Sequence, residues 1–230
     1  MKQLLHFVAC LFITGYCAAQ EPIDVAPGID RWGVKTSANI SSTRKTVTLK
    51  NLLALPLLDE KYSGDSYDDK LIPVQQNGNL KEGDLITTSG YLQLVALERD
   101  SKKHRDGDYH IQLTLYPEWG DSCFIVEIPY AEFVNNKALK DSCNHARKFI
   151  NEKILKGKSP GNGNVMNRGV YVKVTGQLFY DAIHASQMRN PDPNKRAYRG
   201  KKGKMPMPMH SYTAWELHPL VHIEFAREPR

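Results

Sequence analysis

The chain has 230 residues, of which 41% are hydrophobic and 24% are charged, and its formal net charge is +6. This composition is that of an ordinary folded protein, so it excludes a chain that is disordered throughout. The length allows one well-buried domain with additions, or two small domains.

The first 19 residues have the pattern of a cleavable secretory signal. Lys2 supplies a positive charge, the stretch from Leu4 to Ile13 is mostly apolar, and Ala18 and Ala19 are the small residues that a signal peptidase accepts. We therefore predict that residues 1–19 are removed and that the mature protein is secreted or periplasmic. The apolar run is too short to span a bilayer, and no other stretch approaches about 20 apolar residues, so no transmembrane segment is expected.

Residues 20–83 are predicted to form an N-terminal extension. We expect Asp30 to Thr36 to be a short extended segment, with Trp32 packed against the main domain. Thr48 precedes a leucine-rich stretch that ends before Pro56, which predicts a short helix capped by Thr48. The stretch from Asp59 to Gly83 has no clean period and predicts a long loop.

From residue 84 onward the sequence has the pattern of β-strands, in which apolar and polar residues alternate. The predicted elements are strands at Leu85–Glu98, Asp108–Tyr116 and Cys123–Ile128, a helix at Lys137–Leu155, and strands at Gly169–Asp181 and Tyr212–Phe225. Three strands, a helix and two strands is the order of an OB-fold. Residues 84–230 are therefore predicted to be mainly β, as an OB-fold-like five-stranded antiparallel barrel with one helix between strands three and four. Another small β-barrel or a sandwich is the alternative.

Positive charge is concentrated between the last two predicted strands, in a segment that we call the basic segment, residues 189–204. The predicted ligand-binding residues are its cations and the aromatic residues in and after it: Arg189, Lys195, Arg196, Tyr198, Arg199, Lys201, Lys202, Lys204, Tyr212 and Trp215. Cations attract phosphates, and aromatic rings stack on bases. In an OB-fold this connection borders the binding face. The segment indicates a nucleic acid or another polyanion as partner, and a solvated loop that keeps the protein soluble is the alternative.

A second group of polar residues is expected on the outer, wet face of the barrel. Alternation puts Asp108 and His110 on one strand face, and it does the same for Glu216 and His218. The full candidate set is Asp108, His110, Asp181, His184, Glu216 and His218. Histidine beside carboxylates is typical of a metal site or of acid–base catalysis. No cofactor is implied, a divalent metal ion is left open, and a purely structural hydrogen-bond network is the alternative.

Two cysteines, Cys123 and Cys143, remain after the signal is removed. An even number of cysteines in an oxidising compartment favours a disulfide between them. Two buried thiols are the alternative.

Five short motifs are spread over the chain from Arg31 onward. They are Arg31–Thr36 (RWGVKT), Gly107–His110 (GDYH), Glu127–Pro129 (EIP), Gly176–His184 (GQLFYDAIH) and Glu216–Pro219 (ELHP). Together they resemble a family of secreted bacterial proteins with an OB-fold-like domain and no characterised activity. The resemblance implies a shared OB-like core and no reaction. The basic segment is longer here than is expected of that family.

These features predict a secreted, non-enzymatic binding module for an anionic ligand, with nucleic acid or another polyanion first. The motifs of serine hydrolases, P-loop NTPases and zinc metalloproteases are all missing from the sequence, so no catalytic residue is assigned. One alternative is a metal-dependent nuclease or phosphodiesterase that uses the His/Asp/Glu face. Another is a cell-surface interaction protein in which that face is purely structural. The oligomeric state is left open.

Overall fold

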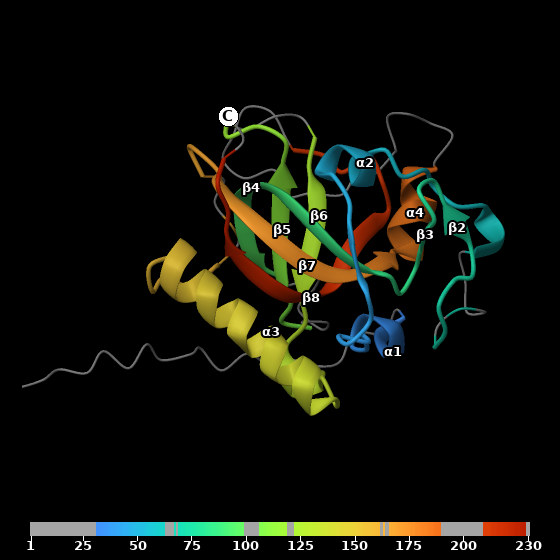
Figure 1. Ribbon diagram of the computed structural model, residues 1–230, viewed down its shortest axis with the longest axis horizontal. Coiled ribbons are helices and arrows are strands. Elements are labelled where there is room, and N and C mark those ends of the chain that lie inside the picture. The colour runs from blue at the N-terminus through green and yellow to red at the C-terminus, as the bar shows by residue number, and fades with distance from the viewer. Residues whose placement is uncertain are drawn as a thin grey trace, which may run out of the picture.

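Figure 1 shows a computed structural model of the protein, which describes residues 31–62, 67, 69–98, 106–118, 122–161, 163, 166–189 and 209–228. The predicted signal peptide and residues 190–208, with most of the basic segment, lie outside this range. Within it, no helix is both long enough and apolar enough to cross a membrane.

The main domain is a closed barrel of five strands. They are β4 (Leu85–Leu97), β5 (Tyr109–Thr114), β6 (Phe124–Ile128), β7 (Val170–Tyr180) and β8 (Trp215–Phe225). Their order around the barrel is β4-β5-β6-β8-β7, and β7 pairs with β4 to close it. The predicted mainly β, OB-fold-like class is confirmed, with one difference: β6 and β8 run parallel, so the barrel is mixed. Helix α3 and strand β7 lie between these two strands in the chain, which is the long connection that a parallel pair requires.

Strand β4 is long enough to serve both neighbours. Its residues from Leu85 to Leu92 pair with β7, and those from Tyr91 to Leu97 pair with β5, with a register shift after Leu92. Gly90 lies where the strand changes partner. A Cβ atom at this position would come within 2.6 Å of a Leu49 methyl carbon and within 3.1 Å of the Thr114 carbonyl oxygen. Only glycine allows this close approach without displacement of its neighbours.

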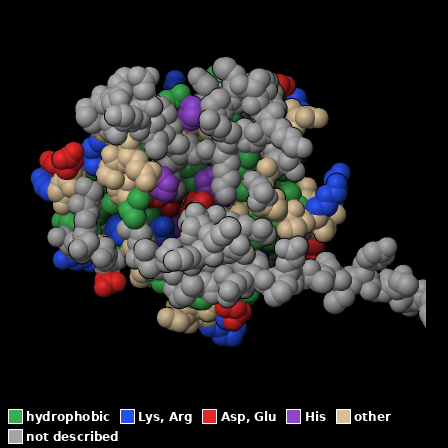
Figure 2. Space-filling view, turned by 180° about the vertical axis from the view of Figure 1, so that it is seen from behind, with side chains coloured by type: hydrophobic (Ala, Val, Ile, Leu, Met, Phe, Trp, Pro, Cys, Tyr) green, Lys and Arg blue, Asp and Glu red, His purple; other side chains and the backbone are tan. Residues whose placement is uncertain are grey.

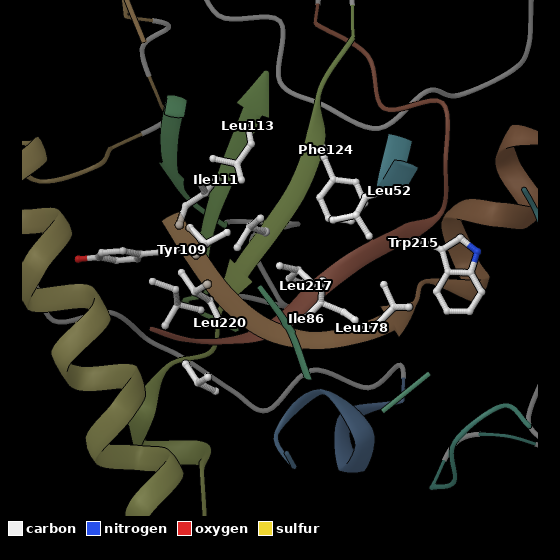
Figure 3. Close-up of a cluster of buried hydrophobic side chains, with 14 of the residues drawn as sticks. Leu52, Ile86, Tyr109, Ile111, Leu113, Phe124, Leu178, Trp215, Leu217 and Leu220 are labelled. Atoms are coloured by element: carbon white, nitrogen blue, oxygen red, sulfur yellow. The ribbon is translucent and has the colours of Figure 1, made fainter. Parts of the chain in front are cut away.

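The interior of the barrel is filled by apolar side chains from one face of every strand. Figure 3 shows fully buried members of this core: Ile86, Ile111, Leu113, Phe124, Leu178, Leu217 and Leu220. Burial of one such side chain stabilises the fold by about 1.5–3 kcal/mol. Trp215 belongs to the same core, and its indole N–H donates to the Pro56 carbonyl oxygen at 2.9 Å.

Helix α3 (Lys137–Phe149) packs against the barrel beside β8. The Asn136 side chain caps it by accepting the backbone N–H of Leu139 at 3.0 Å. Leu139, Cys143 and Ala146 form its buried stripe, as the helical spacing predicted. A π-helical stretch, η4 (Ile150–Ile154), continues it.

The predicted disulfide is absent, because its two cysteines lie in different parts of the packing. Cys143 lies on α3 in the main core, whereas Cys123 belongs to a separate apolar cluster on the outer face of the barrel. Burial raises the pKa of the Cys143 thiol to about 12, which keeps it protonated and unreactive.

The N-terminal extension supplies short elements that lie against the barrel. They are α1 (Trp32–Lys35), β1 (Arg44–Thr46), α2 (Leu49–Leu53), the 3-10 helix η1 (Glu60–Tyr62) and the pair β2 (Gln75–Gln76) and β3 (Leu80–Lys81). The predicted cap of α2 is confirmed, since the Thr48 hydroxyl accepts the N–H of Asn51 at 3.2 Å. The expectation of an extended segment up to Thr36 is wrong, because residues 32–35 form α1. Two further short helices, η3 (Ala131–Phe133) and α4 (Ala182–Met188), follow β6 and β7.

Arg31 is the residue that anchors this extension. Its buried guanidinium pairs with both carboxylate oxygens of Glu82, at 2.6 and 2.8 Å, and donates to the carbonyl oxygens of Tyr67, Lys70 and Tyr180. The expected packing of Trp32 is also observed, with its ring 5.6 Å from that of Phe133.

Candidate acid–imidazole site

Acidic and histidine side chains come together on the outer face of β5, β6 and β8. We call the group the acid–imidazole site: Glu98, Asp108, His110, Glu127, Glu216 and His218. The pleat explains the meeting, since every second side chain of a strand points outward. His110 on β5 lies opposite Glu127 on β6, and β6 lies beside the part of β8 that carries Glu216 and His218. Glu98 and Asp108 end the connection from β4 to β5, and the Glu98 N–H donates to the Asp108 carbonyl oxygen.

The expectation that this face is wet is wrong. Asp108, Glu216 and His218 have no exposed surface, and His110 and Glu127 are buried as well. The same outer face also carries a second apolar cluster: Leu94, Ala96, Cys123, Ile125 and Met209. Figure 2 shows histidine and acidic side chains beside each other near the middle of the face opposite to that of Figure 1.

His218 lies between three carboxylates. Its Nδ1 atom is 3.1 Å from an oxygen of Glu127 and 3.1 Å from an oxygen of Glu216, and its Nε2 atom is 3.3 Å from Asp108 Oδ2. The contact with Asp108 lacks hydrogen-bond alignment, and neither atom has another hydrogen-bond partner among the described residues. The Phe179 ring meets the imidazole edge-on at 5.8 Å between centroids.

His110 lies between two further carboxylates. Its Nδ1 atom is 2.9 Å from Glu127 Oε1 and 3.3 Å from Glu98 Oε2. Glu127 is therefore shared, with one oxygen facing each histidine. Two groups of potential metal ligands result, Glu98–His110–Glu127 and Asp108–Glu127–His218, and within each group the ligand atoms lie within 4.8 Å of one another.

Charge and burial compete in setting the pKa values of the site. Burial alone would lower the pKa of His218, but the surrounding carboxylates outweigh it and raise the pKa well above the ordinary value. The same competition raises the pKa of His110 to about 9, through Glu98 and Glu127. Burial would raise the pKa of Glu127, but the two histidines hold it well below its ordinary value. Burial and the charges of Asp108 and Glu127 raise the pKa of nearby Asp106 to about 8.

Arg147 of α3 holds the backbone around the site in place. Its buried guanidinium donates to the carbonyl oxygens of Gly107, Ile128 and Pro129, at 2.6, 2.9 and 3.1 Å. These residues flank Asp108 and Glu127 in the chain. Asp108 Oδ1 in turn accepts the backbone N–H of Tyr130 at 2.9 Å. Arg147 therefore helps to position the carboxylates of Asp108 and Glu127 through the backbone, because these hydrogen bonds go to carbonyl oxygens and not to the carboxylates.

Asp181 and His184, which the sequence analysis grouped with this site, perform a different task. Asp181 caps helix α4: it accepts the backbone N–H of His184 at 2.9 Å and contacts the same residue's ring at 2.7 Å. Neither residue belongs to the two ligand groups. Of the six predicted residues, Asp108, His110, Glu216 and His218 are brought together.

The described residues of the predicted ligand-binding set have mixed positions. Arg189 donates to the Leu58 carbonyl oxygen and to the Tyr180 hydroxyl, so its guanidinium is engaged within the fold. Trp215 is fully buried and offers no ring face to a ligand, whereas Tyr212 is 48% exposed. The other seven residues of the set lie outside the described residues.

Glu98 and Glu127 are the members of the site that the sequence analysis did not assign. Glu127 stands among apolar neighbours in the strand Cys123–Ile128, and Glu98 follows the apolar end of β4. The only signal for Glu127 in the sequence was the motif Glu127–Pro129 (EIP). In the structure, this motif contributes to the same site as the GDYH and ELHP motifs.

Comparisons with models of protein families, with curated proteins and with solved structures find no match. Membership of the family of secreted proteins that the motifs resemble stays a prediction.

Proposed function

We propose that the protein is a binding module that holds a divalent metal cation in the acid–imidazole site and uses this face to bind an anionic ligand. One observation carries the proposal: carboxylates and imidazoles from three adjacent strands and a loop converge in buried positions on the outer face of the barrel, with Asp108, Glu127 and His218 each offering a ligand atom within 4.8 Å of the others. Buried carboxylates are costly unless a cation or a proton compensates them.

The spacing of the donors suits a metal ion. Metal–ligand bonds of about 2.1 Å place neighbouring ligand atoms about 3.0–3.4 Å apart in octahedral or tetrahedral coordination. The Nε2 atom of His218 is 3.3 Å from Asp108 Oδ2, and an oxygen of Glu127 completes this group, in which all ligand atoms lie within 4.8 Å of one another. Donors that are only nitrogen and oxygen favour cations such as Zn²⁺ and Mn²⁺ over soft ions such as Cu⁺.

Unsatisfied polar atoms add independent support. Asp108 Oδ2 and His218 Nε2 are buried, face each other, and make no hydrogen bond within the described part of the chain. Buried polar atoms in folded proteins nearly always have a partner. Their ion pair at 3.3 Å is not aligned as a hydrogen bond, and a cation between them would bind both atoms.

The position of the site also supports ligand binding. It lies on the second and third strands of the barrel, between the connection that joins strands one and two and the start of strand five. This is the face on which OB-folds bind their ligands, so the support is by analogy of fold.

Calorimetric titration of the EDTA-treated protein with Zn²⁺ tests the proposal. We expect saturable binding, and at 100 times the dissociation constant the cation should stabilise the protein by about 2.7 kcal/mol against unfolding. His218→Asn should abolish binding at the position that Asp108, Glu127 and His218 form. His222→Asn is the matched control, because His222 lies on the same strand but is exposed.

Asp108→Asn preserves the size of the side chain and should weaken binding as well. This variant keeps the test decisive if His218→Asn does not fold. If the wild-type protein binds neither Zn²⁺ nor Mn²⁺, and the variants only lower its melting temperature, the site is an ion-pair network and the proposal falls.

The basic segment supports the anionic part of the proposal. Besides Arg189, it contains six cations and Tyr198 in the sequence between β7 and β8, and Tyr212, just before β8, is exposed. A bound cation would also reduce the repulsion that the carboxylates of this face exert on an anion.

A further inference from the structure

We propose that the acid–imidazole site holds two divalent cations, bridged by the carboxylate of Glu127. This inference rests on the proposed function, and it adds the number of cations and the ligands of each. One position is formed by Glu98, His110 and Glu127, and the other by Asp108, Glu127 and His218, with Glu216 beside it.

The orientation of Glu127 is the first argument. Its Oε1 atom is 2.9 Å from His110 Nδ1, and its Oε2 atom is 3.1 Å from His218 Nδ1. Each oxygen thus points to a different imidazole. A carboxylate that bridges two metal ions divides its oxygens in this way, and such ions lie about 3.5–4 Å apart.

Each position also has ligands of its own. His110 and Glu98 belong only to the first group, and His218 and Asp108 only to the second. Glu216 lies 3.1 Å from the Nδ1 atom of His218, beside the second group but not a member of it. One mononuclear site would leave the members of the other group unused.

Charge is the second argument. The site contains four carboxylates, those of Glu98, Asp108, Glu127 and Glu216, and two imidazoles. Two divalent cations bound to neutral imidazoles balance the four negative charges of these buried carboxylates. Arg147 adds only one positive charge nearby, and its guanidinium donates to backbone carbonyl oxygens.

The donor set has a counterpart in chemistry. Four carboxylates and two histidines are the ligands of paired iron or manganese ions in helical-bundle proteins. Here the same donors come from β-strands and a loop, so the similarity concerns coordination and not fold. Mn²⁺, Fe²⁺ and Zn²⁺ are the cations that such donors accept.

Titration of the EDTA-treated protein with Mn²⁺, followed by electron paramagnetic resonance, tests the inference. We expect two equivalents to bind, with the spectrum of a spin-coupled pair at saturation. Glu98→Gln should retain one equivalent and give the six-line spectrum of an isolated ion, and Asp108→Asn should do the same from the other side. Glu224→Gln, at a partly exposed position of β8, should still bind a coupled pair.

The outcomes separate this inference from the proposed function. One equivalent in the wild-type protein, with no effect of Glu98→Gln, would overturn the pair and leave the single-cation proposal standing. If neither Mn²⁺ nor Zn²⁺ binds, both fail. Circular dichroism of each variant shows whether a loss of bound Mn²⁺ comes from misfolding. The pair is accepted only if Glu98→Gln and Asp108→Asn are both folded and each retains one equivalent.

Discussion

Arg31 shows what a single buried charge does in this fold. Its guanidinium pairs with Glu82, which also accepts the backbone N–H groups of Ile72 and Tyr180 at 2.6 and 2.8 Å. The other face of the guanidinium is near the Phe179 ring, 4.9 Å from its centroid, and that ring meets His218. Arg31 of the extension thus lies against Phe179 of strand β7, whose ring contacts His218 of the acid–imidazole site.

Arg31→Met should destabilise the protein by about 3–5 kcal/mol, because it leaves the carboxylate of Glu82 buried without its cation. Urea unfolding measures the loss. Lys137→Ala breaks an exposed pair with Asp141 and should leave the free energy of unfolding almost unchanged.

A second variant separates the lost pair from lost packing. Arg31→Met combined with Glu82→Gln removes the unpaired charge and should recover part of the stability. Equal free energies of unfolding for the wild-type protein and Arg31→Met would show that the Arg31–Glu82 ion pair does not stabilise the fold.

At the scale of the elements, sequence periodicity predicted the strands and the inside of the barrel well. Ile111 and Leu113 alternate with His110 and Gln112, and the apolar pair faces the core as expected. Periodicity does not determine which strands pair. The parallel contact of β6 with β8 depends on the path of α3 and β7, so it could not be read from any single segment.

The outer face of the barrel was harder to predict than the inside. Polar residues on one strand face normally indicate solvent, but here Leu94, Ile125 and Met209 form an apolar cluster beside the site. What covers a face is a tertiary property that alternation cannot reveal. For the same reason Glu127, which stands in an apolar strand, was not assigned, although its partner His110 was.

Asp181 and His184 were predicted to belong to the polar site, but Asp181 instead caps helix α4. An acidic residue three positions before a histidine on a short helix is also a capping arrangement. The structure has the cap, with Asp181 Oδ1 accepting the N–H of His184.

Asp181→Ala should therefore cost about 0.5–2 kcal/mol of stability, as removal of an N-cap does, while the amount of bound Mn²⁺ stays unchanged. Chemical unfolding and a metal titration on the same sample measure both quantities. A drop in bound metal with intact folding would return Asp181 to the site.

At the scale of the whole molecule, charge is unevenly divided. The acid–imidazole site collects carboxylates on the outer face of the barrel, whereas the segment from Arg189 to Lys204 collects cations between β7 and β8. A polyanion is the ligand that both a cation bound in the site and the basic segment would attract.

Single-stranded DNA should therefore bind at low salt and dissociate as salt is added, with a log–log slope of about −0.7 for each phosphate contact. Replacing Lys201, Lys202 and Lys204 with Gln should remove most of the affinity and reduce the slope, because these contacts release counterions. EDTA treatment should weaken binding more in the wild-type protein than in His218→Asn. Fluorescence anisotropy across a salt series measures these effects, and Lys50→Gln, at an exposed position of helix α2, is the control. Affinity that the triple variant retains would exclude the basic segment as the contact.

If the DNA is instead cut in the presence of Mn²⁺, and both EDTA and His218→Asn prevent the cut, the module is a metal-dependent phosphodiesterase.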